Sequence, residues 1–207
     1  MALVQKINIE SDFCDYYDHL ASSEDTIAKY KRINKNNLTK GSAIAYMKQL
    51  GIMTIHIGTV NELSVLHNKL VVYTEPNKHG GDGKVLMSSQ DAKMTYPNYL
   101  ASPYYEDTAE ITNKFLQIGK RRFRLVIENK NVFKFGKLLA IDEISSEHNY
   151  IVALPIFSID YVSTKYGMLA CDFNNVENLA SIGLKNIINP SDIINEIYYS
   201  LVVYNKI

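Results

Sequence analysis

Hydrophobic and polar positions alternate in two neighbouring stretches of the C-terminal part of the chain, as they do along β-strands. The stretches are residues 156–162 (IFSIDYV) and 168–174 (MLACDFN), and both are rich in β-branched and aromatic residues. Turn-forming residues lie between them at 163–167. The pattern predicts an antiparallel hairpin.

Four polar side chains interrupt the apolar pattern of this hairpin. Because side chains alternate in direction along a strand, Asp172 and Asn174 share one face. Ser158 and Asp160 share one face of the other strand for the same reason. A turn centred on Tyr166 sets Asp160 opposite Asp172, and it sets Ser158 opposite Asn174. All four side chains are therefore predicted to converge.

The two aspartates would repel each other across the strand pair unless positive charge lay between them. A divalent cation is the simplest such charge, and Mg²⁺ prefers hard oxygen ligands of this kind. We therefore predict that Asp160, Asp172 and Asn174 bind Mg²⁺. In the alternative interpretation, one aspartate faces solvent and the other caps a turn.

Elsewhere the apolar periodicity predicts short helices and strands, which together give an α+β protein. Residues 100–107, which contain Ser-Pro-Tyr-Tyr, are predicted to be irregular. Helices are predicted at 12–20, 42–50, 89–96 and 191–201, with a helical turn or two at 61–66, and strands at 52–57, 69–73, 85–87, 120–128 and 138–144.

A glycine-rich segment lies between two of the predicted strands. It holds Gly80, Gly81 and Gly83, followed by Lys84. Glycines let a backbone turn its N–H groups toward an anion, and the lysine adds a positive charge, so the segment is a candidate phosphate-binding loop. His79 is the histidine of greatest interest because it lies inside this loop. The alternative is an ordinary hairpin turn with a surface histidine.

A basic stretch at 120–124 leads into the strand predicted at 120–128. Arg122 and Arg124 fall on one face of that strand, where their planar guanidinium groups suit phosphate. The alternative is a basic patch for a nucleic-acid backbone. Lys plus Arg and Asp plus Glu each number 22, so the overall charge argues against nucleic-acid binding.

Composition places few further limits on function. The 207 residues suffice for one substantial core or two small lobes. Cys14 and Cys171 are far apart and fit no metal or redox spacing, which indicates free thiols in a reducing compartment. No signal peptide or membrane-spanning run is recognised, so a cytoplasmic protein is predicted. The acidic and aromatic segment 12–19 is either a solvated helix face or a functional acidic patch.

The order of these motifs resembles the ATP-grasp family. In that family an Asp in an apolar strand is followed by Glu-x-Asn, often with Pro-Gly after it. This chain has Asp160 and then Asp172-Phe173-Asn174, so Asp replaces Glu and Pro-Gly is missing. The family usually carries a lysine on the strand before the glycine-rich loop, where this chain has Tyr73 or Thr74. Lys69 or Lys78 would have to substitute for it.

The resemblance implies an ATP-grasp-like fold of two small α/β lobes with mostly antiparallel sheets. It divides the chain into an N-terminal helical segment at 1–38, a small lobe at 39–118 and a C-terminal lobe at 119–207. The implied cofactors are ATP and Mg²⁺, with the loop from Gly80 to Lys84 on the phosphates and Arg124 or Arg122 at the reacting phosphate.

The implied activity is that of a carboxylate-amine ligase that works through an acyl phosphate on an unknown small-molecule, peptide or protein acceptor. The alternative is a non-catalytic protein that keeps an ATP-grasp-like shell to bind a nucleotide or a host protein. The segment at 12–18 also resembles the start of small bacteriophage-borne proteins, which would place the chain in a host cytoplasm.

Overall fold

A computed structural model describes residues 38–75, 82–105, 110–118, 121–131, 133–144, 156–165, 167–174, 189 and 192. The helix predicted at 12–20 lies outside the described residues, as does the helix predicted at 191–201 apart from residue 192. His79, Gly80 and Gly81 also lie outside them.

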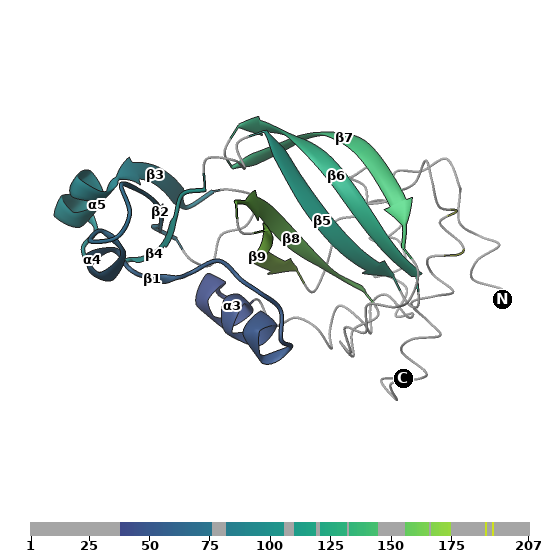
Figure 1. Ribbon diagram of the computed structural model, residues 1–207, viewed down its shortest axis with the longest axis horizontal. Coiled ribbons are helices and arrows are strands. Elements are labelled where there is room, and N and C mark those ends of the chain that lie inside the picture. Colours follow the sequence, from purple (N-terminus) through teal and green to yellow (C-terminus); the bar gives the residue numbers. More distant parts are fainter. Residues whose placement is uncertain are drawn as a thin grey trace, which may run out of the picture.

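Two antiparallel sheets form the framework (Figure 1). The smaller has the strand order β1-β4-β2-β3, and the larger has the order β7-β6-β5-β8-β9. The described helices are α3 (Lys40–Gln49), α4 (Val60–Leu63) and α5 (Ser89–Thr95). The strands are β1 (Gly58–Thr59), β2 (Lys69–Tyr73), β3 (Lys84–Ser88), β4 (Leu100–Pro103), β5 (Ile111–Ile118), β6 (Arg121–Asn131), β7 (Lys134–Glu143), β8 (Ile156–Thr164) and β9 (Gly167–Asn174).

Helix α3 packs against the larger sheet, close to the smaller one (Figure 1). Thr39 caps its N-terminus by accepting a hydrogen bond from the backbone of Ser42, and Gly51, with φ of 76°, follows its end. Its buried stripe meets the aromatic face of the sheet, and burial of this apolar surface holds the helix in place. The core residues are Ala43, Ile44, Met47, Ile52, Ile55, Phe115, Phe157, Ile159, Ala170 and Phe173.

Helices α4 and α5 cover the smaller sheet (Figure 1). Thr59 and Glu62 form a capping box at the start of α4, and Ser88 caps α5 by accepting a hydrogen bond from the backbone of Asp91. A second, smaller core joins helices and sheet through Val60, Leu63, Leu70, Val72, Ala92 and Ala101.

The hairpin prediction is confirmed in its register. Strands β8 and β9 pair antiparallel, with Asp160 opposite Asp172 and Ser158 opposite Asn174. The register then shifts at a bulge between Asp160 and Tyr161, because Tyr161 pairs with Ala170 and not with Cys171. The bulge leaves Cys171 as the extra residue on β9 without disturbing the face that carries the acids.

Two secondary-structure predictions were wrong, and one strand was missed. Residues 52–57 do not alternate, because Ile52 and Ile55, three positions apart, both enter the core. This segment meets β9 through only a single bridge, from Thr54 to Ala170. Residues 100–107 were predicted irregular, but Leu100–Pro103 forms β4, which pairs with β1 and β2. The strand β5, central to the larger sheet, was not predicted at all.

Gly83 is the position where the fold most clearly requires glycine. Its φ is +70°, and an added Cβ would lie 2.6 Å from Glu75 Cβ and 2.8 Å from the Glu75 carbonyl oxygen. Gly83→Ala should lower the free energy of unfolding by about 1–3 kcal/mol, measured by urea denaturation. Gly41→Ala is the matched control, since its Cβ would meet nothing within 4 Å and alanine should stabilise α3 by about 1 kcal/mol. Equal effects at both positions would contradict this account of the turn.

Candidate functional site: a charged cluster between the two sheets

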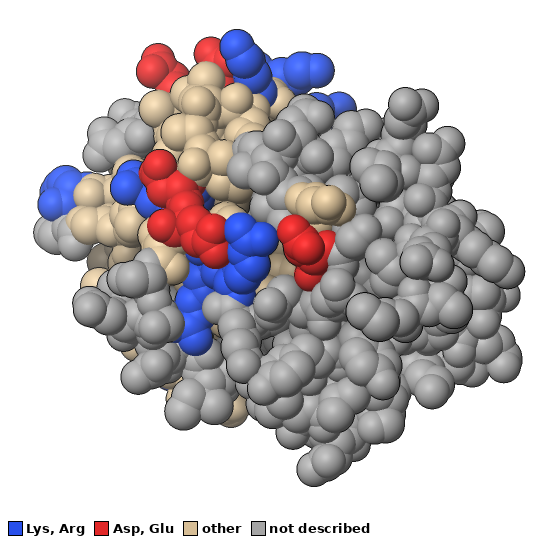
Figure 2. Space-filling view, turned by 90° about the vertical axis from the view of Figure 1, so that its right-hand side faces the viewer, with Lys and Arg blue, Asp and Glu red and all other residues tan. Residues whose placement is uncertain are grey.

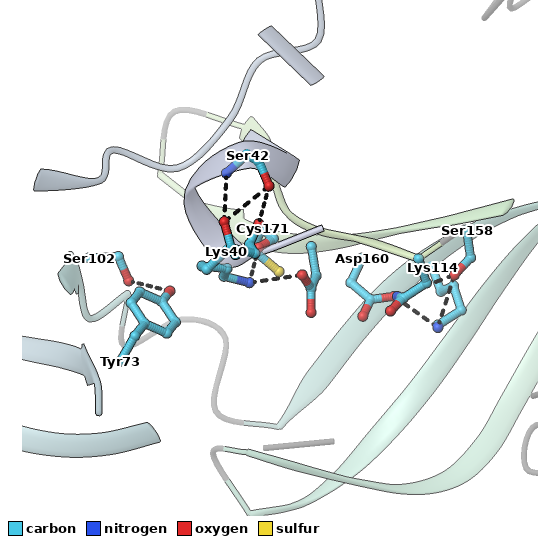
Figure 3. A network of polar contacts seen from close by, with 11 residues as sticks. Lys40, Ser42, Tyr73, Ser102, Lys114, Ser158, Asp160 and Cys171 are labelled. Carbon is cyan, nitrogen blue, oxygen red and sulfur yellow. Dashed lines mark hydrogen bonds and ion pairs between the residues drawn. The ribbon is translucent and has the colours of Figure 1, made fainter. Parts of the chain in front are cut away.

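Five charged side chains from four strands and one helix gather where the two sheets approach each other. The ladder pairs Lys114 of β5 with Asp160 of β8, and Asp160 with Asp172 of β9, so these three side chains share one face of the larger sheet. Lys40 comes from the first turn of α3, and Lys84 comes from β3 of the smaller sheet. Figure 3 shows Lys40 between Tyr73 on one side and Asp160 with Lys114 on the other.

The ion pair between Lys114 and Asp160 is the most deeply buried part of the cluster. Their charged atoms are 3.0 Å apart, and the side chains are only 2% and 9% exposed. Lys114 also donates a hydrogen bond of 3.3 Å to the hydroxyl of Ser158, and the amide of Asn174 lies 3.5 Å from the same hydroxyl. Ser158, Asp160 and Asn174 therefore form one connected group with Lys114.

A second ion pair joins Lys40 to Asp172 across 3.1 Å. Lys40 also donates a hydrogen bond to the carbonyl oxygen of Cys171. A lysine in the first turn of a helix opposes the helix dipole, and α3 has no acidic residue in that turn. Contacts with β9, and not helix stability, therefore explain the position of Lys40.

Tyr73 forms the boundary of the cluster on the side of the smaller sheet. Its hydroxyl hydrogen-bonds the hydroxyl of Ser102 at 3.0 Å, and the Lys40 ammonium lies 5.4 Å from the centre of its ring. The ring thus offers Lys40 a cation–π contact in a buried setting. Burial raises the pKa of Tyr73, an effect that the nearby Lys40 charge opposes.

Lys84 brings a third ammonium group into the same field. Burial lowers its pKa, and repulsion from Lys40 lowers it further, while Asp172 and Asp160 partly offset both effects. In the part of the chain that the structure describes, the cluster thus holds three lysines against two aspartates. The excess positive charge suits an anionic ligand.

The pKa values of Asp172 and Cys171 on β9 are also shifted by burial and by the charges of the cluster. Burial alone would raise the pKa of Asp172, but the charges of Lys40, Lys84 and Lys114 outweigh it and hold this pKa below its usual range. Burial raises the pKa of the neighbouring Cys171 thiol to about 12, which disfavours its thiolate form.

The donor set of the hairpin fits a hard cation. Asp160 and Asp172 present carboxylates on one face, and Asn174 and Ser158 add neutral oxygens beside them. Among the described residues, no three His, Cys, Asp or Glu side chains come together as a metal site. A cation here would therefore rely on two carboxylates and on ligands supplied from elsewhere, a pattern common for Mg²⁺.

The structure does not bring the predicted arginines to this cluster. Arg124 pairs with Phe115, the neighbour of Lys114, so Arg122 and Arg124 lie on the opposite face of the sheet from the aspartates. Arg124 instead donates a hydrogen bond of 3.2 Å to Asn113 on that face.

The structure describes part of the glycine-rich loop and one of the two lysines proposed to replace the strand lysine of the family. Gly83 and Lys84 are described, and Lys84 reaches the cluster. Lys69 lies exposed at the far end of β2, 5.9 Å from the ring of Tyr104, so it does not replace a strand lysine beside Tyr73. Lys78 lies outside the described residues.

The described part of the basic stretch gives nucleic-acid binding little support. The guanidinium of Arg121 makes two hydrogen bonds of 2.8 Å to Glu143, which neutralises it. Figure 2 shows acidic and basic side chains intermixed on the described part of the face that it presents. A surface that binds the phosphate backbone of a nucleic acid would need a continuous basic area.

Sequence reasoning missed two of the three lysines. Lys114 was missed because its strand was not recognised, since Thr112, Asn113 and Gln117 interrupt the apolar pattern there. Lys40 was missed because the predicted helix begins only at residue 42, whereas α3 begins at Lys40. The feature that could have revealed it is its position directly after the capping Thr39, because a cation in the first turn of a helix is unfavourable.

Comparison with solved structures identifies the fold as ATP-grasp-like. The chain superposes on the ATP-grasp ligase PsnB in complex with a minimal precursor with a TM-score of 0.59 at 10% identity, covering 83% of this chain and 63% of PsnB. It also matches the D-alanine-D-alanine ligase of Helicobacter pylori, with a TM-score of 0.51 at 16% identity, covering 80% of this chain and 58% of the ligase. Two antiparallel sheets with few helices are the α+β arrangement that the motif order predicted.

A third match is the Bacillus anthracis D-alanine–D-alanine ligase complexed with ATP, with a TM-score of 0.52 at 13% identity, covering 82% of this chain and 66% of that one. The chain spans about three fifths of the length of PsnB and of the Helicobacter ligase. No protein-family model and no curated protein matches the sequence. No helix in the described ranges has the length and hydropathy to cross a membrane.

Removing one partner of the most buried ion pair should be costly. Lys114→Met leaves the Asp160 carboxylate buried without this cation, and we expect a loss of about 3–5 kcal/mol in the free energy of unfolding, measured in urea. Adding Asp160→Asn should recover part of that loss because the stranded charge disappears. The exposed Lys48→Met is the control and should change stability by less than about 0.5 kcal/mol. Lys114→Met with wild-type stability would refute a structural role for the pair.

The lowered pKa of Asp172 makes stability depend on acid. An aspartate in the unfolded chain has a pKa of about 3.9, so the stabilisation from this lowered folded-state pKa is fully present above about pH 4 and is lost as pH falls through the folded value. The free energy of unfolding of the wild type should therefore fall more steeply in this acid range than that of Asp172→Asn. The free energy of unfolding of both proteins is measured by chemical denaturation across this pH range. If it falls equally steeply in the wild type and in Asp172→Asn, the ion pair of Asp172 is not the cause of the acid dependence.

Proposed function

We propose that the chain binds a nucleoside triphosphate with Mg²⁺ at the charged cluster and acts as an ATP-dependent carboxylate-amine ligase. The observation that carries the proposal is the cluster itself, with its excess of lysine over aspartate between the two sheets of an ATP-grasp-like fold. The solved structures that it resembles include a ligase complexed with ATP and PsnB complexed with precursor peptide PsnA2 and AMPPNP.

The residues divide into two groups by charge. Asp160, Asp172 and Asn174 supply oxygens suited to Mg²⁺, which when bound would offset charge on the phosphates during transfer. Lys40, Lys84 and Lys114 supply ammonium groups for phosphate oxygens. Burial around the cluster strengthens each of these interactions because little water screens them.

The proposed reaction proceeds in two transfers. A carboxylate oxygen of the acceptor attacks the γ-phosphorus, the bond to the bridging oxygen breaks, and ADP leaves, which yields an acyl phosphate. The nitrogen of an amine then attacks the acyl carbon, phosphate departs with its electron pair, and the amine loses a proton. The lysines serve both steps by holding phosphate oxygens, without covalent chemistry of their own.

The division into a small lobe at 39–118 and a C-terminal lobe at 119–207 stays a prediction. The pairing of β5 with β8 favours a C-terminal lobe that begins before Ile111 and not after Ile118. The acceptor is a small molecule, a peptide or a protein, and the complex of PsnB with a precursor peptide is the reason to test peptides first.

A second candidate is a non-catalytic nucleotide-binding or protein-binding chain with an ATP-grasp-like shell. The observation in its favour is that this chain has Tyr73 or Thr74 where the family usually carries a lysine. The side chain of Tyr73 already contacts Ser102 and Lys40. Calorimetry with ATP and Mg²⁺ separates the candidates when ADP release is measured alongside. Binding without ADP release supports nucleotide sensing, and the absence of binding supports a protein-interaction role.

Asp172→Ala tests the enzyme proposal directly. We expect Mg²⁺-dependent ADP formation to fall by at least about 100-fold, because one of two carboxylate ligands is lost. Circular dichroism should show an intact fold. Glu128→Gln, an exposed acid on β6, is the matched control and should keep wild-type turnover. If wild-type protein neither gains thermal stability from ATP with Mg²⁺ nor consumes ATP, the enzyme proposal is wrong.

A further inference from the structure

We propose that Lys40 and Lys114 block the carboxylates from metal until a triphosphate draws the lysines away, so that metal and nucleotide bind as a coupled pair. The inference rests on the proposed function and concerns how the same site is regulated. It begins from the fact that both candidate carboxylate ligands are already engaged by ammonium groups.

The engaged atoms are the ones that a metal would need. Lys114 lies 3.0 Å from Oδ1 of Asp160, and Lys40 lies 3.1 Å from Oδ1 of Asp172. A divalent ion that enters alone must displace an ammonium group whose side chain is only 2% or 7% exposed. That ammonium would remain buried beside the incoming charge, which is strongly unfavourable.

A triphosphate that arrives alone meets the reverse difficulty. Phosphate oxygens attract Lys40, Lys84 and Lys114 away from the aspartates. Asp160 and Asp172 then face each other across the strand pair with weaker compensation, next to an added polyanion. Neither ligand alone leaves the buried charges matched.

Counting charge shows why both together are favoured. The three lysines and two aspartates leave one net positive charge. With a triphosphate of about −4, the cluster would carry about +3 with Mg²⁺ alone, about −3 with the nucleotide alone and about −1 with both. Buried charge is costly in proportion to its imbalance, so each ligand should raise the affinity for the other by the same factor.

The experiment measures Mn²⁺ binding by electron paramagnetic resonance, because free and bound Mn²⁺ are distinguished without catalysis. The full chain is titrated with Mn²⁺ alone and with a saturating non-hydrolysable ATP analogue. For the wild type we expect the analogue to tighten Mn²⁺ binding by at least about tenfold. Equal affinity for Mn²⁺ with and without bound analogue would overturn the inference while leaving nucleotide binding intact.

Lys40→Met supplies a test that needs no nucleotide. Removing the ammonium frees Asp172, so Mn²⁺ alone should bind several-fold more tightly than to the wild type. Lys48→Met, on the same helix and exposed, is the matched control and should bind Mn²⁺ as the wild type does. If Lys40→Met binds Mn²⁺ no more tightly than the control, the lysine does not exclude metal and the inference is wrong.

The two proposals fail in different ways. An analogue that does not bind the wild type under any condition refutes the proposed function, whereas the Lys40→Met result still reports on metal exclusion. Lys40 is nearly buried, so circular dichroism must show that Lys40→Met is folded. If it is not, the wild-type comparison with and without analogue decides the question alone, since it requires no substitution.

Discussion

The need to match buried charge is the constraint on which the rest of this structure depends. A lysine or aspartate can leave water only where a partner compensates it. Here the partners come from separate elements. The ion pair of Lys114 with Asp160 joins β5 to β8, and the ion pair of Lys40 with Asp172 joins α3 to β9. Lys84 and Tyr73 extend the same field to the smaller sheet. The charged cluster therefore adds to the apolar core in determining how the helix and the strands meet.

Stability alone does not explain why these residues are present. Buried ion pairs are often no more stabilising than apolar residues of similar size. Lys40 stands in the helix turn least suited to a cation, and Asp160 lies directly opposite another aspartate. These locally unfavourable choices meet in one place, and such conflicts concentrate at functional sites. The presence of these residues together therefore supports the proposed ligand-binding site.

The hairpin could be predicted because one rule decides it. Alternation of side chains and a short turn fix a register, and the pairing of Asp160 with Asp172 follows from them. No comparable rule was available for β5, where Thr112, Asn113, Lys114 and Gln117 are all buried among apolar residues. A strand covered on both faces loses its alternation, since burial no longer distinguishes the two sides.

The position of the arginines shows the cost of missing that strand. The shared face of Arg122 and Arg124 was predicted correctly, but its relation to the acids depends on the register of β5 with both β6 and β8. Long-range pairing of this kind is set by tertiary packing, and a local pattern does not contain it. Lys40 illustrates the same limit, because its partner Asp172 lies far along the chain.

Tyr73 adjusts the electrostatics of the site without disturbing its architecture. A lysine at this position, as the family usually has, would add a further positive charge to the three ammonium groups nearby. The tyrosine contributes only a polarisable ring and a hydroxyl bound to Ser102. With less excess positive charge from the protein, a larger share of the compensation for the phosphates of the proposed ligand would come from the metal. In the proposed complex, the charge balance of the protein would therefore set how strongly phosphate binding depends on a divalent cation.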